Sequence, residues 1–163
     1  MDDLHQLRLT PREGAFPREA VASEVGPRRA LARCKILMRA ETTAMVAANT
    51  VNKGDVLNTA RIAGIQAAKQ AAALLPMSHV VLVGNVHINF NIADAFIEVE
   101  ASVDTVDRTG VEMEAMVAVS VAALTIYDMC KSSDRTMTIE NVALWEKSGG
   151  RSGTWRRDSS SSL

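Results

Sequence analysis

Two groups of charged residues in the sequence have the types and spacing needed for chemistry on an anionic substrate. Lys53 precedes Gly54 and Asp55, just before a segment with helical periodicity. The start of a helix offers unpaired N–H groups and a partial positive charge, so a lysine there suits phosphate, and Arg61 adds a second cation. By itself, a KGD tripeptide indicates no more than an ordinary glycine turn with a solvated lysine.

The second group is Asp128 and Lys131, which lie three positions apart near the end of a later helix and therefore share a face. A paired acid and amine can exchange protons with a substrate, although most such pairs are plain surface salt bridges. Glu112 and Glu114 stand where the same helix begins. Because the helix dipole alone favours acidic residues there, the spacing favours a structural role for them.

The distance along this helix limits what one chain can do. Glu112 and Asp128 are sixteen positions apart, which on a straight helix is roughly 24 Å of rise with azimuths about 160° apart. One chain could hardly bring both carboxylates to a small substrate. If both are functional, either the site is assembled from two subunits or the helix breaks.

Two further features leave alternatives open. His79 stands at the start of a predicted strand, and either a structural or a functional role is open for it. His87 lies within the strand and is interpreted as structural, because a lone histidine is more often a packed residue than a catalyst. The KSGGRSG stretch at 147–153 could wrap backbone amides around an oxyanion, with Lys147 and Arg151 adding charge. Because it matches neither a P-loop nor a GxGxxG fingerprint, a flexible tail is the favoured interpretation.

The elements that must position these residues follow from periodicity and breakers. We expect strands at 29–37, within 79–90, at 97–103 and at 137–145, helices at 39–48, 59–75 and 114–130, and a hairpin connection at 91–95. The order β-α-α-β-β-α-β predicts an α+β, ferredoxin-like fold with helices on one face of an antiparallel sheet. Helix 114–130 is apolar around its circumference, and a second copy of the chain is the simplest cover for its outer side.

Length and composition predict one domain. The chain has 163 residues, of which 47% are hydrophobic, enough for one sizeable core. Residues 1–27 are rich in Pro and Gly without periodicity and are expected to form an irregular arm. Residues 28–153 form the single α+β domain, and residues 154–163, with their serine run, are expected to be a disordered tail.

Charge and cysteine usage exclude several classes of protein. The net charge is −1, whereas nucleic-acid binding needs a strong positive excess. Cys34 and Cys130 lie far apart with no metal-ligand spacing, which argues against a zinc site or a disulfide framework and favours reduced, cytoplasmic thiols. The N-terminus lacks the features of a signal peptide and the longest apolar stretch, 115–127, is too short to span a bilayer, so we expect a soluble protein that does not bind membranes.

Taken together, five contiguous blocks resemble the cyclic pyranopterin monophosphate synthase family (MoaC) of molybdenum cofactor biosynthesis. They are KGDVL at 53–57, TARIAGIQAAK at 59–69, TGVEMEA at 109–115, VAALTIYDMCK at 121–131 and KSGGRSG at 147–153. The likeness runs from about Arg28 to Gly153, with the blocks in the family's order.

The resemblance implies a ferredoxin-like subunit in a homohexamer, a trimer of dimers, whose active sites lie between subunits. It also implies a lyase reaction that converts (8S)-3′,8-cyclo-7,8-dihydroguanosine 5′-triphosphate into cyclic pyranopterin monophosphate and diphosphate, with no cofactor and no metal. The substrate, a cyclised GTP derivative, comes from a separate radical enzyme with iron-sulfur clusters, for which two cysteines are too few.

The resemblance further implies roles for individual residues. Asp128 matches the catalytic acid/base, Lys131 the lysine beside it, and Lys53 a second lysine that holds phosphate and stabilises charge as diphosphate leaves. The implied substrate-binding positions are Arg28, Met77, Ser78, His79, Glu112, Met113, Glu114 and Lys147.

Two departures from the family pattern stand out. The family's Leu-Cys-His-Pro is Met77-Ser78-His79-Val80 here, and its Met-Val-Asp-Val-Ser is replaced around residues 17–21. The alternative function is therefore a divergent paralogue that keeps the anion pocket as a binding or assembly subunit without turnover. Retention of the lysines and of Asp128 favours an active enzyme, because a pure binder has less need of a proton-transfer pair.

Overall fold

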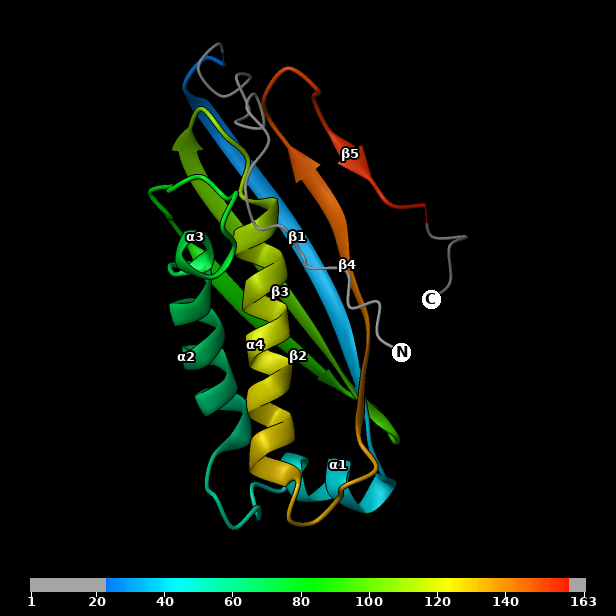
Figure 1. Ribbon diagram of the computed structural model, residues 1–163. Helices are drawn as coiled ribbons and strands as arrows, with labels where there is room; N and C mark the ends of the chain where they lie inside the picture. Colours follow the sequence, from blue (N-terminus) through cyan, green and yellow to red (C-terminus); the bar gives the residue numbers. More distant parts are fainter. Residues whose placement is uncertain (1–22, 159–163) are drawn as a thin grey trace, which may run out of the picture.

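A five-stranded antiparallel sheet carries the helices on one of its faces, as the computed structural model of residues 23–158 shows (Figure 1). The strands are ordered β2-β3-β1-β4-β5. This architecture confirms the predicted α+β, ferredoxin-like fold. The elements are β1 (Gly26–Leu37), α1 (Ala40–Ala47), α2 (Val56–Ala68), α3 (Ala71–Leu74), β2 (Val86–Ile92), β3 (Phe96–Asp107), α4 (Glu112–Cys130), β4 (Thr138–Ser148) and β5 (Trp155–Arg156).

The core lies between the sheet and α4. Side chains on a strand alternate between faces, and every second residue of β1 from Ala30 to Ile36 is buried, as is every second residue of β3 from Ile97 to Val103. The buried β1 residues include two alanines, whose small side chains leave room for a helix to approach. The central strands thus provide the surface along which α4 lies (Figure 1).

Away from the sheet, α4 packs against α2 of the same chain, while Leu124 on α4 stays 57% exposed. Cover of this exposed part by a second copy of the chain stays a prediction. Gly64 makes this packing close, because a Cβ added to it would lie 2.9 Å from the carbonyl oxygen of Ala118. By length and composition α4 could cross a membrane, but half of its apolar window is buried inside the chain. A core helix passes the same test, so this is weak evidence for a membrane span.

The helix predicted at 59–75 has different bounds. It begins earlier, at Val56, because the carboxylate of Asp55 caps it by accepting a hydrogen bond of 3.0 Å from the backbone N–H of Asn58. It ends at Ala68, and a break at Lys69 and Gln70 separates it from the short α3.

Only the end of the β-rich segment predicted at 79–90 is a strand. β2 begins at Val86. Before it, the N–H of Gly84 donates to the carbonyl oxygen of Asp104, and a Cβ on Gly84 would lie 2.6 Å from that oxygen. The N–H of Asp104 donates in turn to the carbonyl oxygen of Asn85, so two residues of this segment bond to one residue of β3, and regular pairing starts only at Val86. The hairpin connection is also shorter than the predicted 91–95, because β2 continues to Ile92.

Regular structure also reaches beyond the predicted bounds of the domain. β1 starts at Gly26, inside the expected arm, and the rest of that arm up to residue 22 lies outside the described residues. β5 extends past residue 153: Trp155 pairs with Lys147, and the backbone N–H of Arg157 donates to the carbonyl oxygen of Trp145. The expectation of a tail without structure from 154 thus does not hold for these residues, and residues 159–163 lie outside the described part.

Candidate functional site

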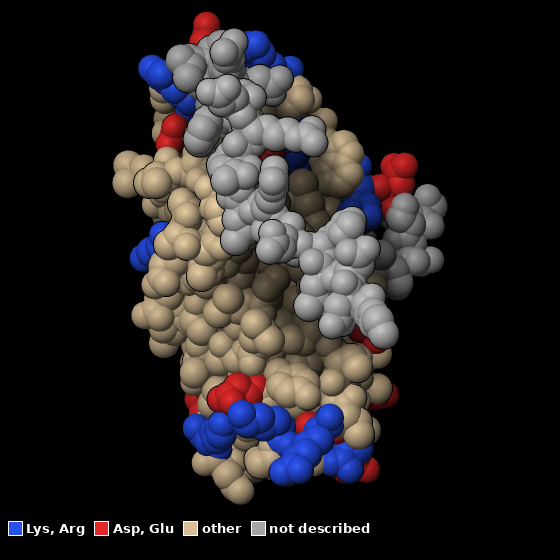
Figure 2. Space-filling view, viewed as in Figure 1, with Lys and Arg blue, Asp and Glu red and all other residues tan. Residues whose placement is uncertain are grey.

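Three charged side chains converge at the C-terminal end of α4. The ammonium nitrogen of Lys131 lies 2.6 Å from one carboxylate oxygen of Asp128, and that of Lys53 lies 3.0 Å from the other. Charged side chains gather at this end of the molecule, beside α1 and the last turn of α4 (Figure 2). Asp128 is 57% exposed, so the cluster is open to a ligand.

The two lysines control the charge of the aspartate. Hydrogen bonds from Lys131 and then Lys53, together with their positive charges, lower the pKa of Asp128 to about 2. The side chain is therefore a carboxylate at neutral pH, with an ammonium group on each oxygen.

Local structure explains how Lys53 reaches Asp128 across 75 positions of sequence. Val51 is buried in the core, and Gly54, with a φ of +101°, closes the turn by donating its N–H to the carbonyl oxygen of Val51. Asp55 then starts α2. Lys53 also donates to the backbone carbonyl of Asp128 at 2.9 Å, one of the oxygens left unpaired at the end of a helix.

Arg61 does not join this cluster. Its guanidinium donates to Asn58 and to the backbone carbonyl of Ile88, and it lies over the ring of Phe90. The second cation expected beside Lys53 is instead Lys131.

Two adjoining hollows lie at the opposite end of α4. The larger, of about 540 Å³, is lined by side chains that include Arg28, His79 and Lys147 and by the residues that follow β4. The smaller, of about 180 Å³, shares His79 and Glu112 with it. All the residues that the resemblance marks for substrate binding line one or both: Arg28, Met77, Ser78, His79, Glu112, Met113, Glu114 and Lys147.

The KSGGRSG stretch forms the turn between β4 and β5 and part of the larger hollow's wall, whereas the sequence favoured a flexible tail. Gly149 has a φ of +92°, and a Cβ there would lie 2.2 Å from the carbonyl oxygen of Pro27. Lys147 donates to the hydroxyl of Ser152 across the turn. The turn also packs beside Arg28. Four cationic side chains line the hollow, those of Arg28, Arg108, Lys147 and Arg151.

Glu114 is a buried carboxyl at the start of α4. Burial raises its pKa, its own backbone N–H lowers it, and the charge of Glu112 raises it again, with a net rise. A carboxyl whose pKa is raised can be kept protonated and donate a hydrogen bond. A structural role for Glu112 and Glu114 is also supported, because both lie in the first turn of α4, where the helix dipole favours acidic side chains.

The structure does not bring the two ends of α4 together within one chain. α4 is one unbroken helix of 19 residues. Its helical rise therefore keeps Glu112 and Asp128 roughly 24 Å apart. The sequence left two ways for both residues to serve one site, a break in the helix or a site assembled from two subunits, and the unbroken helix excludes the first.

Sequence reasoning missed two residues at these ends. Arg108 lines the larger hollow, and its position directly before the TGVEMEA block could have indicated it. Asp134 is buried near the cluster of Asp128, but it lies in a polar stretch that gives no signal of burial. Across residues 23–158 no group of three or more His, Cys, Asp or Glu side chains could hold a metal ion.

Comparison with known proteins supports one family. The model of the MoaC family matches residues 20–150. A protein of Thermomicrobium roseum named cyclic pyranopterin monophosphate synthase is 53% identical over 131 residues, which cover 79% of either chain. Proteins with the same name from a Roseiflexus species and from Chloroflexus aggregans are 53% and 47% identical, over 80% and 83% of this chain and 84% of their own lengths. With four-fifths of its length matched in this way, the chain belongs to the MoaC family.

Proposed function

We propose that this protein is a cyclic pyranopterin monophosphate synthase of molybdenum cofactor biosynthesis. It is a lyase that converts the cyclised GTP-derived triphosphate into cyclic pyranopterin monophosphate and diphosphate. Relatives that are 53% identical over about four-fifths of the chain carry this name. The observation that carries the proposal is the convergence of Lys53 and Lys131 on the two carboxylate oxygens of Asp128.

Asp128 acts as the acid/base of the reaction. With a pKa near 2 it is ionised at neutral pH, so it first accepts a proton from the substrate and later returns one. The phosphates of the substrate compete with Asp128 for Lys53. As Lys53 turns to phosphate, the pKa of Asp128 rises, which helps the aspartate to hold the proton, and the ammonium group offsets the charge of the departing diphosphate.

The two hollows bind the substrate. Arg28 and Lys147 line the larger one and hold phosphate oxygens. The smaller one holds the ring system, where Met77 and Met113 offer apolar contact and Glu114 a buried carboxyl. His79 lines both and lies between the ring and the phosphates.

The complete site is formed by two copies of the chain. In a twofold-symmetric contact the same surfaces meet in opposite directions, so the Asp128 end of one α4 lies against the Glu112 end of the partner. Ile62 on α2 and Leu124 on α4 are more than half exposed on the helical layer and suit such a contact. The assembly is a homohexamer built as a trimer of dimers, and light scattering should give the mass of six chains.

A binding or assembly subunit without turnover is the second candidate. It is favoured by Met77-Ser78-His79-Val80, which line or flank the smaller hollow and depart from the family's sequence there. Turnover separates the two candidates.

The test incubates the purified protein with the cyclised GTP substrate and measures diphosphate release. We expect release by the wild type and none by Asp128→Asn, because the amide cannot accept a proton. Asp128 is exposed, so the variant should keep the wild-type melting temperature and mass. Absence of release by the wild type, with the substrate still bound, would support the second candidate.

A further inference from the structure

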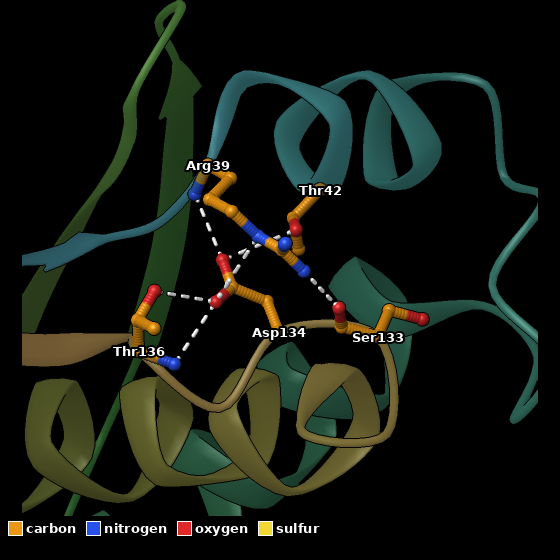
Figure 3. A network of polar contacts seen from close by, with 5 residues as sticks. All are labelled: Arg39, Thr42, Ser133, Asp134 and Thr136. Atoms are coloured by element: carbon orange, nitrogen blue, oxygen red, sulfur yellow. Dashed lines mark hydrogen bonds and ion pairs between the residues drawn. The ribbon is translucent and has the colours of Figure 1, made fainter.

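Near the catalytic cluster, a buried carboxylate joins two segments that are far apart in sequence. The side chain of Asp134 is 0% exposed. One of its oxygens accepts hydrogen bonds from the backbone N–H of Arg39 at 2.8 Å and the hydroxyl of Thr42 at 3.2 Å. The other accepts from the N–H and the hydroxyl of Thr136, at 3.0 and 2.7 Å (Figure 3).

The guanidinium of Arg39 strengthens the same junction. Its Nε lies 3.5 Å from Asp134, and it also donates to the backbone carbonyl of Ser133 (Figure 3). Burial raises the pKa of Asp134, but the bonds from Arg39, Thr136 and Thr42 outweigh it and hold the pKa well below its usual range. Asp134 is therefore a charged, fully bonded anchor.

The two segments that Asp134 joins are those that supply the lysines. On one side, the N–H of Asp134 donates to the carbonyl oxygen of Cys130 in a tight turn directly after Lys131, the C-cap of α4. On the other side, Arg39 is the residue from which α1 starts, and the turn after α1 leads to Lys53. The position of α1 relative to the end of α4 thus decides where Lys53 lies relative to Asp128.

We propose that Asp134 is a positioning residue of the active site, whose buried carboxylate holds the Lys53 and Lys131 segments at the separation that lets both ammonium groups reach Asp128. This inference rests on the proposed function for its importance to turnover. The geometry itself does not depend on turnover, and it can be tested without substrate.

The test is the titration of Asp128 in the folded protein. Asp128 is followed by carbon-13 NMR of labelled aspartate carboxyls, and the spectrum of Asp128→Asn identifies its signal. In Asp134→Asn an amide N–H₂ replaces an acceptor and faces the donors of Thr136 or Arg39. We expect the junction to open, the lysines to withdraw, and the midpoint of Asp128 to rise from about 2 to about 3 or above, towards its ordinary value.

A titration of Asp128 from pH 6 to pH 3 is sufficient to separate the variant from the wild type. At pH 3, the wild-type Asp128 is about one-tenth protonated and the variant at least about half. Thr105→Val is the control, because it removes another buried hydroxyl bond, to the carbonyl oxygen of Leu82, away from the junction. It should lower the melting temperature without moving the titration of Asp128.

If the titration midpoint of Asp128 is unchanged in folded Asp134→Asn, the proposal is overturned and Asp134 is a purely structural residue. If that variant does not fold, Thr136→Val decides, because it removes only the 2.7 Å bond and keeps the shape of the side chain. A smaller rise of the midpoint is expected there, and no rise would equally refute the proposal. Failure of the proposed function would instead appear as absent turnover with the titration shift intact.

Discussion

Pairing two inactive variants should restore activity if the site is shared between chains. Asp128→Asn damages the cluster at one end of α4, and His79→Ala damages the hollows at the other. Both side chains are exposed, so both variants should fold. Each variant alone has no intact site. In a mixed assembly, the native cluster of one chain can meet the native hollows of another.

The size of the recovery follows from the geometry. The 19 residues of α4 keep cluster and hollows apart in each chain, so every site of the proposed kind would draw its two halves from different chains. With random mixing at equal amounts, a site has an intact cluster in half of the cases and intact hollows in half, which gives about one quarter of wild-type activity. The assay is diphosphate release from co-expressed chains carrying different tags, purified through both tags in turn.

A matched pair provides the control. Asp128→Asn mixed with Lys53→Ala places both defects in the same cluster, so no site in the mixture has an intact cluster and no recovery is expected. Two results would refute a site divided between the two ends of α4. One is recovery of activity in this control, and the other is no recovery in the mixture of Asp128→Asn and His79→Ala although both tags are present.

Three further predictions follow from single side chains. Lys53→Ala should weaken diphosphate binding at least about tenfold, because a charge-assisted hydrogen bond is lost; unchanged affinity in calorimetry would contradict its phosphate role. Glu114→Gln should raise the melting temperature at pH 7.5 but not at pH 4. Burial raises the pKa of Glu114 above its unfolded value of 4.5. Ionised Glu114 therefore destabilises the folded state only as the pH rises above that value, and the glutamine variant removes this cost. An equal gain at both pH values would contradict this. Gly149→Ala should cost at least about 1 kcal/mol in denaturant unfolding, because alanine is strained at its positive φ and collides with Pro27; an unchanged unfolding midpoint would show that the turn can move.

Long elements with a strong pattern could be predicted from the sequence, but their ends could not. The alternation along β3 and the apolar run of α4 identified both correctly. The start of α2 was missed because Asp55, which lies before the predicted helix, supplies the cap. The strand expected within 79–90 is missing before Val86, where Val80 and Leu82 are exposed and a Cβ on Gly84 would collide with β3. Such outcomes depend on long-range packing, which local propensity does not contain.

The candidate site was predictable to a different degree in each part. The pairing of Lys131 with Asp128 follows from helical spacing alone. The approach of Lys53 depends on the burial of Val51 and on the turn at Gly54, which only the tertiary structure supplies, so the resemblance alone connected it with Asp128. The substrate-binding residues were likewise placed together by the resemblance.

The separation of the two ends of α4 has a consequence for control of the chemistry. In the chain by itself, both oxygens of Asp128 are occupied by lysines, and the pKa near 2 makes it a weak base. The hollows that would hold a triphosphate belong to the opposite end, so its phosphates cannot reach the lysines of the same chain. In the proposed two-chain site, a substrate held by a neighbouring copy draws Lys53 away and raises the basicity of Asp128. Proton transfer would thus begin only when an assembled site is filled, and the junction around Asp134 matters because it keeps both lysines on Asp128 until that moment.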